Sequence, residues 1–139
     1  MWIDYIENNN YISNLYKYKT PNIDGVIIDE VIIESNEHIQ LILRFEIHDM
    51  PDKMPTEWEE ENYDRFIFVL KLESANIKSI AINGDNFRNV NIDISEINNG
   101  LKRIIGKNKL GKSIFEFEGE KIFIEEILGY NYEYSLEIW

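Results

Sequence analysis

Residues 38–47 read HIQLILRFEI, and this stretch decides the fold that we expect. Its odd-numbered positions are apolar from Ile39 to Ile47, whereas its even-numbered positions include Arg44 and Glu46. Side chains alternate between the two faces of a strand, so this pattern gives one apolar face and one largely polar face. We therefore predict a β-strand that buries its odd-numbered side chains.

The two-residue period continues along most of the chain. Further strands are expected at residues 26–35, 65–72, 77–82, 90–94, 101–105, 113–118, 121–127 and 132–138. Residues 2–16 instead fit a short amphipathic helix, which Asn8 to Asn10 would interrupt. Closely spaced strands with almost no helical pattern between them indicate one mostly β domain over residues 1–139. We expect an antiparallel meander that forms a curved sheet or a sandwich, with one short N-terminal helix.

The composition agrees with a sheet and narrows the choice of partner. The chain has 25 isoleucines and two alanines, and β-branched side chains favour a pleated, half-buried surface. Its formal net charge of -12 disfavours nucleic acid and anionic membranes as partners, because both are negatively charged. The charge favours a basic protein partner, although acidic residues also serve solubility alone.

What the sequence lacks disfavours several classes of protein. Without cysteine, the chain has neither a disulfide framework nor thiol chemistry. No apolar run approaches the roughly 20 residues that a membrane-spanning helix needs. The opening residues, MWIDYIENNN, contain no basic region followed by an apolar one, as a secretory signal would. A cytoplasmic location is therefore expected.

An acidic stretch, EIHDMPDKMPTEWEEENYD at residues 46–64, separates two strong strand patterns. It carries eight carboxylates and one lysine. Long loops that are held by a rigid sheet often bind partners. The predicted partner-binding residues are Asp49, Asp52, Met54, Glu57, Trp58, Glu59, Glu60 and Glu61. In this set the acidic residues would steer and contact a basic partner, with Met54 and Trp58 as the apolar centre.

The side chain of Trp58 has two alternative placements. It could be an exposed anchor for a partner, since tryptophan is enriched at binding hot spots. It could instead fold back over the sheet edge and hold the loop in place. We favour the folded-back position, which would also present the neighbouring glutamates rigidly.

Residues 106–113, GKNKLGKS, match the phosphate-binding pattern G-x-x-x-x-G-K-[ST]. In a true site Lys112 would reach the phosphates, Ser113 would hold magnesium, and a helix would follow directly. Here residues 113–118 alternate like a strand and Gly119 ends the run. A small-ligand or nucleotide-binding β domain is thus an alternative function, and a basic hairpin loop is the favoured interpretation.

Other catalytic and metal-binding patterns are weak. His38 and His48, the only histidines, stand ten residues apart on one predicted strand, which spans on the order of 30 Å and separates them too far to share a metal ion. No serine lies in a G-x-S-x-G turn, and residues 49–60 lack the glycine of a calcium-binding EF-hand loop. We predict surface histidines, no catalytic residue, no metal and no cofactor, so the chain is expected not to be an enzyme.

A set of features along the first half of the chain resembles one protein family. They are Trp2, the turn at 21–23, the strand at 41–47, the Met-Pro pairs that lead to Trp58 at 50–58, and the aromatic strand at 66–70. The chain resembles the immunity protein 50 family of bacterial polymorphic toxin systems. The resemblance implies a cytoplasmic, mostly β protein that binds and neutralises a cognate toxin, and it supplies no catalytic residues. If the toxin is a nuclease, an acidic surface would occlude its basic active site.

A third class of function rests on the C-terminus. Residues 130–139, YNYEYSLEIW, are aromatic and could pair with a copy of themselves at a sheet edge. This pattern would make the chain a self-associating structural domain. An immunity protein can itself be a monomer or a homodimer, so self-association does not separate the two hypotheses.

Overall fold

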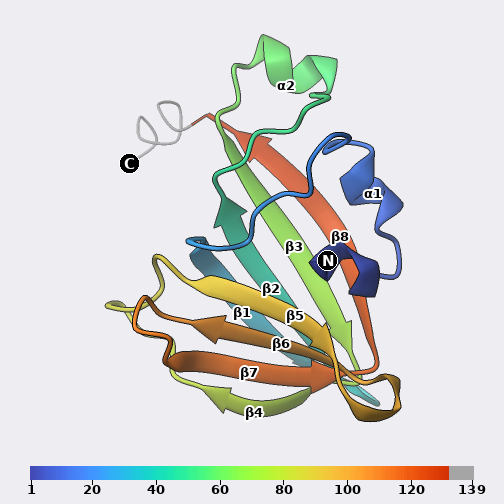
Figure 1. Cartoon of the computed structure of the whole chain (residues 1–139), viewed down its shortest axis with the longest axis vertical. Coiled ribbons are helices and arrows are strands. Elements are labelled where there is room, and N and C mark those ends of the chain that lie inside the picture. Colours follow the sequence, from blue (N-terminus) through green and yellow to red (C-terminus); the bar gives the residue numbers. More distant parts are fainter. Residues whose placement is uncertain (132–139) are drawn as a thin grey trace.

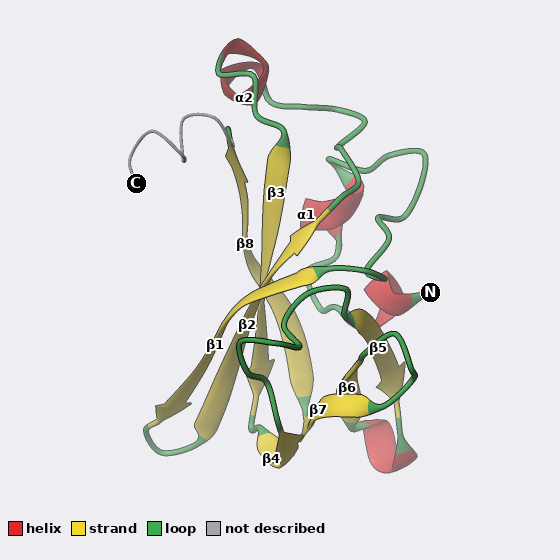
Figure 2. Ribbon diagram, turned by 90° about the vertical axis from the view of Figure 1, so that its left-hand side faces the viewer, coloured by secondary structure: helices red, strands yellow, loops and turns green. Residues whose placement is uncertain are grey.

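The structure, a computed structural model, describes residues 1–131, and in this part eight strands form two antiparallel four-stranded sheets (Figure 1). The first sheet has the order β1-β2-β3-β8, with β1 at Ile27–Ser35, β2 at Ile39–Ile47, β3 at Arg65–Glu73 and β8 at Lys121–Tyr130. The second has the order β4-β7-β6-β5, with β4 at Asn76–Ile80, β5 at Asn91–Glu96, β6 at Lys102–Lys107 and β7 at Ser113–Gly119. The second sheet runs across one face of the first, on the same side as the N-terminal turns (Figure 2).

The expected mostly β, antiparallel fold is confirmed. Each strand predicted within the described residues is present, with ends that differ by a few residues. The chain-order meander holds for β1-β2-β3 and for β5-β6-β7, whereas β8 returns to pair with β3 and β4 pairs with β7. The predicted strand at 132–138 lies outside the described residues.

Helical structure is limited to short turns in the described part. The expected N-terminal helix is divided into η1 (Trp2–Tyr5) and α1 (Asn10–Ser13). Two turns were not expected: α2 (Thr56–Glu60) inside the acidic stretch and η2 (Asn98–Gly100) before β6. No helix of residues 1–131 combines the length and apolar character that crossing a membrane requires.

The core lies between the two sheets, and the alternation of β2 explains its position. The odd-numbered side chains from Leu41 to Ile47 are all buried, and they stand opposite Leu72, Leu70, Phe68 and Phe66 of β3. Each such side chain contributes about 1.5–3 kcal/mol by leaving water. The second sheet supplies Phe115 and Phe117, whose rings stack 4.9 Å apart. The first sheet therefore gives a well-packed support for the loops at the ends of its strands.

The N-terminal segment covers the outer edge of β8. Ile6 forms a parallel bridge with Ile122, and the backbone N–H of Glu7 donates to the carbonyl of Ile122 at 2.8 Å. The side chain of Asn8 then donates to the carbonyl of Ile124 and accepts from its N–H, both at 2.8 Å. One asparagine amide thus replaces a strand residue and satisfies backbone groups that would otherwise be open at the edge.

Candidate partner-binding site

The acidic stretch forms an ordered turn at one end of the molecule, beyond the end of the first sheet (Figure 1). Pro55 precedes α2 with φ of -56°, and its carbonyl accepts from the N–H groups of Trp58 (3.0 Å) and Glu59 (3.2 Å). Proline has its φ fixed near this value, so it is suited to start a helical turn. The sequence pattern missed α2 because one helical turn is too short to show a 3.6-residue period.

Trp58 holds this turn on the sheet. Its ring is partly buried against the core and lies 5.8 Å from the Phe66 ring of β3 and 6.2 Å from the Tyr63 ring. A Cβ atom at Gly129 of β8 would lie 2.6 Å from Tyr63 Cδ2 and 3.1 Å from Trp58 Cδ2, so the two rings need a glycine beneath them. The prediction that Trp58 folds back is confirmed, and the turn is fixed to both β3 and β8.

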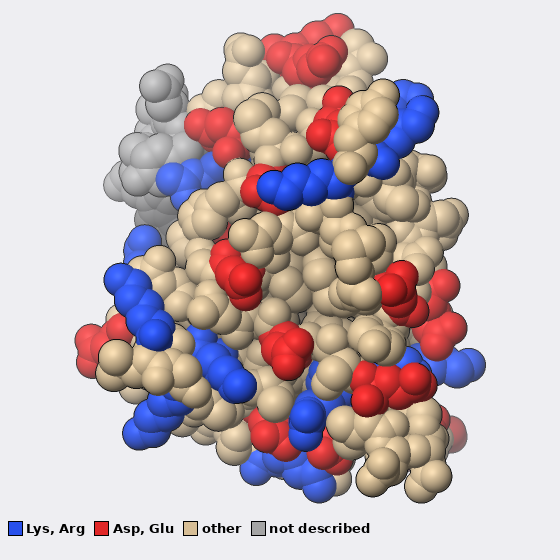
Figure 3. Space-filling view, in the orientation of Figure 1, with Lys and Arg blue, Asp and Glu red and all other residues tan. Residues whose placement is uncertain are grey.

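Four of the predicted site residues form an exposed acidic group on α2 and its end. They are Glu57, Glu59, Glu60 and Glu61. Within residues 1–131 none of their side chains makes a hydrogen bond or an ion pair, so their charges face solvent. Figure 3 shows acidic side chains gathered at this end of the molecule. Met54 is partly buried against the core beside the turn.

The two predicted aspartates, Asp49 and Asp52, form hydrogen bonds within the protein. The carboxylate of Asp49 accepts from the backbone N–H of Asn22 at 2.8 Å, and the carboxylate of Asp52 accepts from that of Tyr18 at 2.9 Å. The Tyr16 hydroxyl donates to the Asp49 carbonyl at 2.8 Å. Burial, with the charges of Asp49 and Asp52, raises the pKa of Tyr16 well above its ordinary value, so the hydroxyl stays a neutral donor. These residues anchor the acidic stretch to the N-terminal segment, and their contact with a partner stays a prediction.

The loop at residues 106–113 is the tip of the β6–β7 hairpin, and its geometry does not fit a phosphate-binding loop. Asn108 Oδ1 accepts from the N–H groups of Leu110 and Lys112, each at 3.0 Å, while its carbonyl accepts from Gly111 at 2.9 Å. Three of the loop amides that a phosphate would need are therefore already bonded, and β7 follows where a helix is required. The nucleotide alternative loses its structural basis.

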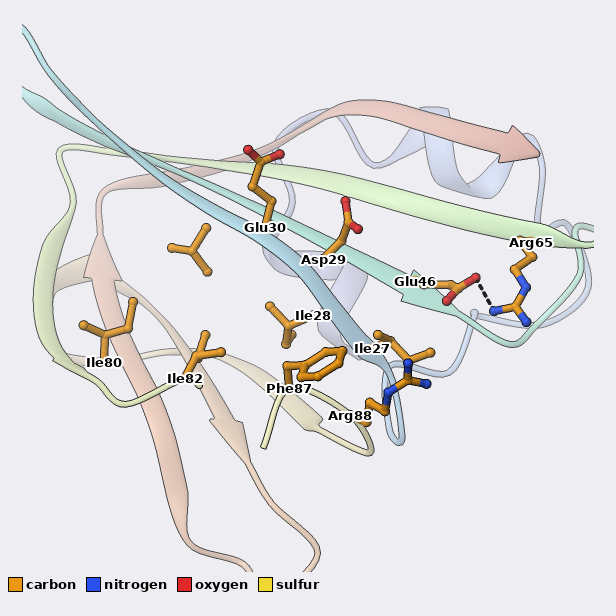
Figure 4. A pocket seen from close by; sticks show the side chains of 11 residues that line it. Ile27, Ile28, Asp29, Glu30, Glu46, Arg65, Ile80, Ile82, Phe87 and Arg88 are labelled. Atoms are coloured by element: carbon orange, nitrogen blue, oxygen red, sulfur yellow. Dashed lines mark hydrogen bonds and ion pairs between the residues drawn. The ribbon is translucent and has the colours of Figure 1, made fainter. Parts of the chain in front are cut away.

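A groove that the sequence did not reveal lies between β1 and residues 80–88, with a volume of about 610 Å³ (Figure 4). Its polar end contains Glu46, which is only 7% exposed and accepts from Arg65 Nη1 and from the Tyr130 hydroxyl, each at 2.9 Å. Burial and this hydrogen bond raise the pKa of Tyr130 to about 12. No signal in the sequence marks the groove, because β1 and residues 80–88 meet only in the folded chain.

Within residues 1–131, neither histidine belongs to a group of side chains placed to bind a metal ion. His38 and His48 are exposed, as predicted, and the His48 ring is 2.8 Å from the carbonyl of Gly25. Among the residues that the structure describes, no group of three or more histidine, cysteine, aspartate or glutamate side chains is placed to hold a metal ion. The geometry of the described part is that of a charged, rigid surface.

Comparison with known protein families shows to which family the chain belongs. The sequence model of the family Immunity protein 50 matches residues 8–130. The chain belongs to the Immunity protein 50 family. The match includes the acidic turn, the groove and all eight described strands, so it extends the resemblance far beyond the first half of the chain. No curated protein and no solved structure matches this Immunity protein 50 sequence.

Proposed function

We propose that this Immunity protein 50 family member binds a cognate protein toxin in the cytoplasm and neutralises it by covering its active site. The family supports an immunity function, which implies a toxin as partner and inhibition without catalysis. The occlusion mechanism and the basic character of the toxin are our own inferences from the charge of the chain.

The observation that carries the mechanism is the packing of Trp58 beneath Glu57, Glu59, Glu60 and Glu61. Ordering a charged loop at an interface costs conformational entropy, and a loop that is already ordered avoids this cost. A fixed acidic surface also attracts a basic partner and speeds encounter. The active site of a nuclease is basic because it holds phosphate, so such a toxin would fit this surface.

The test compares two variants with the same change in net charge. The first reverses Glu57, Glu59 and Glu60 to lysine, and the second reverses Asp85, Asp93 and Glu120, which are exposed acidic residues outside the turn. The toxin is first captured from lysate of the native bacterium with the tagged wild-type protein, then purified, and its affinity for each variant is measured.

We expect the acidic-turn variant to lose at least about tenfold in affinity, because each desolvated charged contact matters by 2 kcal/mol or more. The control variant should bind nearly as the wild type does, and both should unfold at similar denaturant concentrations. Equal losses of affinity in the two variants would show that only the net charge of the protein matters. This result would contradict the assignment of the turn as the binding site.

A further inference from the structure

Within residues 1–131, the outer edge of β1 has no strand paired with it over most of its length. Near its start, Val26 and Val90 exchange backbone hydrogen bonds of 2.9 and 3.0 Å, and the N–H of Ile28 donates to the carbonyl of Phe87 at 2.8 Å. After Ile28, the described residues provide no backbone partner on this side of β1. An open strand edge is a template for another strand.

The backbone groups at this edge can be assigned from the hydrogen bonds of β2. Residues of a strand alternate in the side to which they turn their N–H and C=O groups. The carbonyl of Ile39 accepts from Ala75 at 2.7 Å, on the β3 side, so odd-numbered residues of β2 bond towards β3. Even-numbered residues of β2 bond to β1, and from Glu30 onward, past the irregularity after Ile28, their partners in β1 are also even-numbered. The N–H and C=O groups of Val31 and Ile33 therefore point outward at the free edge.

The apolar part of the groove described above runs beside the inner face of this edge. Val31 and Ile33 stand opposite Leu43 and Leu41, and hence their side chains share the core face of the sheet. The second sheet does not close over them: Ile33 is 48% exposed, and Ile80 across the groove is 47% exposed. Figure 4 shows the apolar side chains of the groove gathered on one side of β1, with those of Asp29 and Glu30 pointing away from them.

The outer face of the same edge is acidic. β1 contains Asp29, Glu30 and Glu34 and no basic residue. The Asp29 carboxylate is already paired with Arg44 Nε at 2.9 Å. Glu30 and Glu34 are exposed, and within residues 1–131 neither side chain makes a hydrogen bond or an ion pair. A strand that is added here would place its own outward side chains beside these two charges.

We propose that β1 accepts a fifth strand, namely an extended basic segment of the partner protein. Alternate side chains of that segment would be apolar and enter the groove, while the others would be lysine or arginine beside Glu30 and Glu34. Its backbone would bond the outward groups of Val31 and Ile33, which is strand addition at a sheet edge. The inference rests on the proposed function only in taking the partner to be a protein.

The charge pattern selects against a second copy of this chain as the occupant. Pairing β1 with β1 of another molecule would bring glutamates of both copies together on one face. Like charges on neighbouring strands destabilise the pairing. The same charge pattern would disfavour pairing with any acidic strand and favour pairing with a basic one, so it contributes to selectivity for the partner.

The experiment uses the full-length, ¹⁵N-labelled protein and two synthetic ten-residue peptides as probes. One peptide alternates valine with lysine and the other alternates valine with glutamate. We expect the lysine peptide to slow hydrogen exchange at the amides of Val31 and Ile33 and to leave β8 amides unchanged. The glutamate peptide should bind at least about tenfold more weakly, given the charge terms of neighbouring strand residues.

Variants separate the backbone contribution from the charge contribution. Ile33→Pro removes an outward N–H that no described strand uses, and Ile33→Ala is its control because it removes side-chain atoms and keeps the N–H. The proline variant should bind the lysine peptide several-fold more weakly than the alanine variant. A variant with Glu30 and Glu34 reversed to lysine tests the charges even if the proline variant does not fold. This variant should bind the glutamate peptide more tightly than the lysine peptide.

Three results would overturn the proposal. They are equal binding of both peptides, protection at another surface, and a dimer in sedimentation that Ile33→Pro dissociates. The variant with Glu57, Glu59 and Glu60 reversed should still take up the lysine peptide. Loss of toxin binding in that variant together with normal peptide uptake distinguishes the acidic turn from the β1 edge, so either proposal can fail without the other.

Discussion

The ring of Trp58 lies 5.8 Å from the ring of Phe66, and this contact joins the acidic turn to the core of the first sheet. Phe66 is fully buried on β3, whereas Trp58 belongs to α2 and is only partly buried. The pair therefore connects the buried core to the charged surface that we propose to bind the toxin.

Replacing Trp58 with alanine should destabilise the protein by about 1–3 kcal/mol, less than a fully buried aromatic residue would cost. Urea unfolding measures this loss, and Trp58→Phe should recover most of it. Hydrogen exchange at residues 56–64 should rise more in the alanine variant than elsewhere in the chain. Unchanged exchange in this turn would show that Trp58 does not hold it.

Gly129→Ala should destabilise the protein by about 1–3 kcal/mol, the usual cost of overpacking. The new methyl group would lie 2.6 Å from Tyr63 Cδ2 and 3.1 Å from Trp58 Cδ2, so both rings must move. Gly84→Ala is the matched control, because no atom lies within 4 Å of a Cβ there. Thermal unfolding of the two variants checks the difference, and similar midpoints would contradict the close packing at Gly129.

Stability should fall as the pH rises from 10 to 12, partly through Tyr130. Its pKa is raised to about 12 by burial and by the hydrogen bond to Glu46, from 10.0 in the unfolded chain. The neutral hydroxyl is thus favoured in the folded state, so its stabilising effect is complete below pH 10 and is lost as the pH passes 12. Tyr16 shifts in the same direction and adds to the slope.

The variant Tyr130→Phe isolates the contribution of this hydroxyl. It should lower stability at pH 7 by about 1–2 kcal/mol, since one hydrogen bond to a charged group is lost, and should flatten the slope between pH 10 and 12. Tyr18→Phe is the control, because Tyr18 is 84% exposed. Equal slopes for Tyr130→Phe and wild type in denaturant titrations at high pH would refute the assignment.

Asn8→Ala should cost about 1–3 kcal/mol, because two backbone groups of Ile124 lose their partner. The change also opens part of the β8 edge, so aggregation should increase at high protein concentration. Asn10→Ala is a suitable control, since the Asn10 side chain is exposed. Light scattering and urea unfolding together check both effects; a soluble Asn8→Ala variant of normal stability would disprove the edge-covering role.

The strands could be predicted from the sequence because their alternation is local. The apolar positions of residues 38–47 lie on the core face of β2, as expected. The order of the strands could not be predicted, since β8 returns to β3 across about a third of the chain. Pairing of that kind depends on which edges remain free when the chain has folded, and no local pattern encodes it.

The candidate site, too, could be predicted only in part from the sequence. The acidic turn was recognisable because its charges and Trp58 are contiguous in the sequence. The anchoring roles of Asp49 and Asp52 were not, because their partners Asn22 and Tyr18 belong to a segment about 30 residues earlier. The groove beside β1 depends in turn on the contact between Ile28 and Phe87, which only the fold brings about.

The asparagine that covers β8 also determines how many partners the first sheet can accept. A sheet polymerises into a fibre only when both of its outer strands can pair, as in stacked cross-β assemblies. Here the N-terminal segment blocks one side at Ile122 and Ile124, so a strand that joins β1 ends the extension. If a partner strand joins β1 as we propose, we therefore expect each molecule to take up one strand at that edge, in a one-to-one complex.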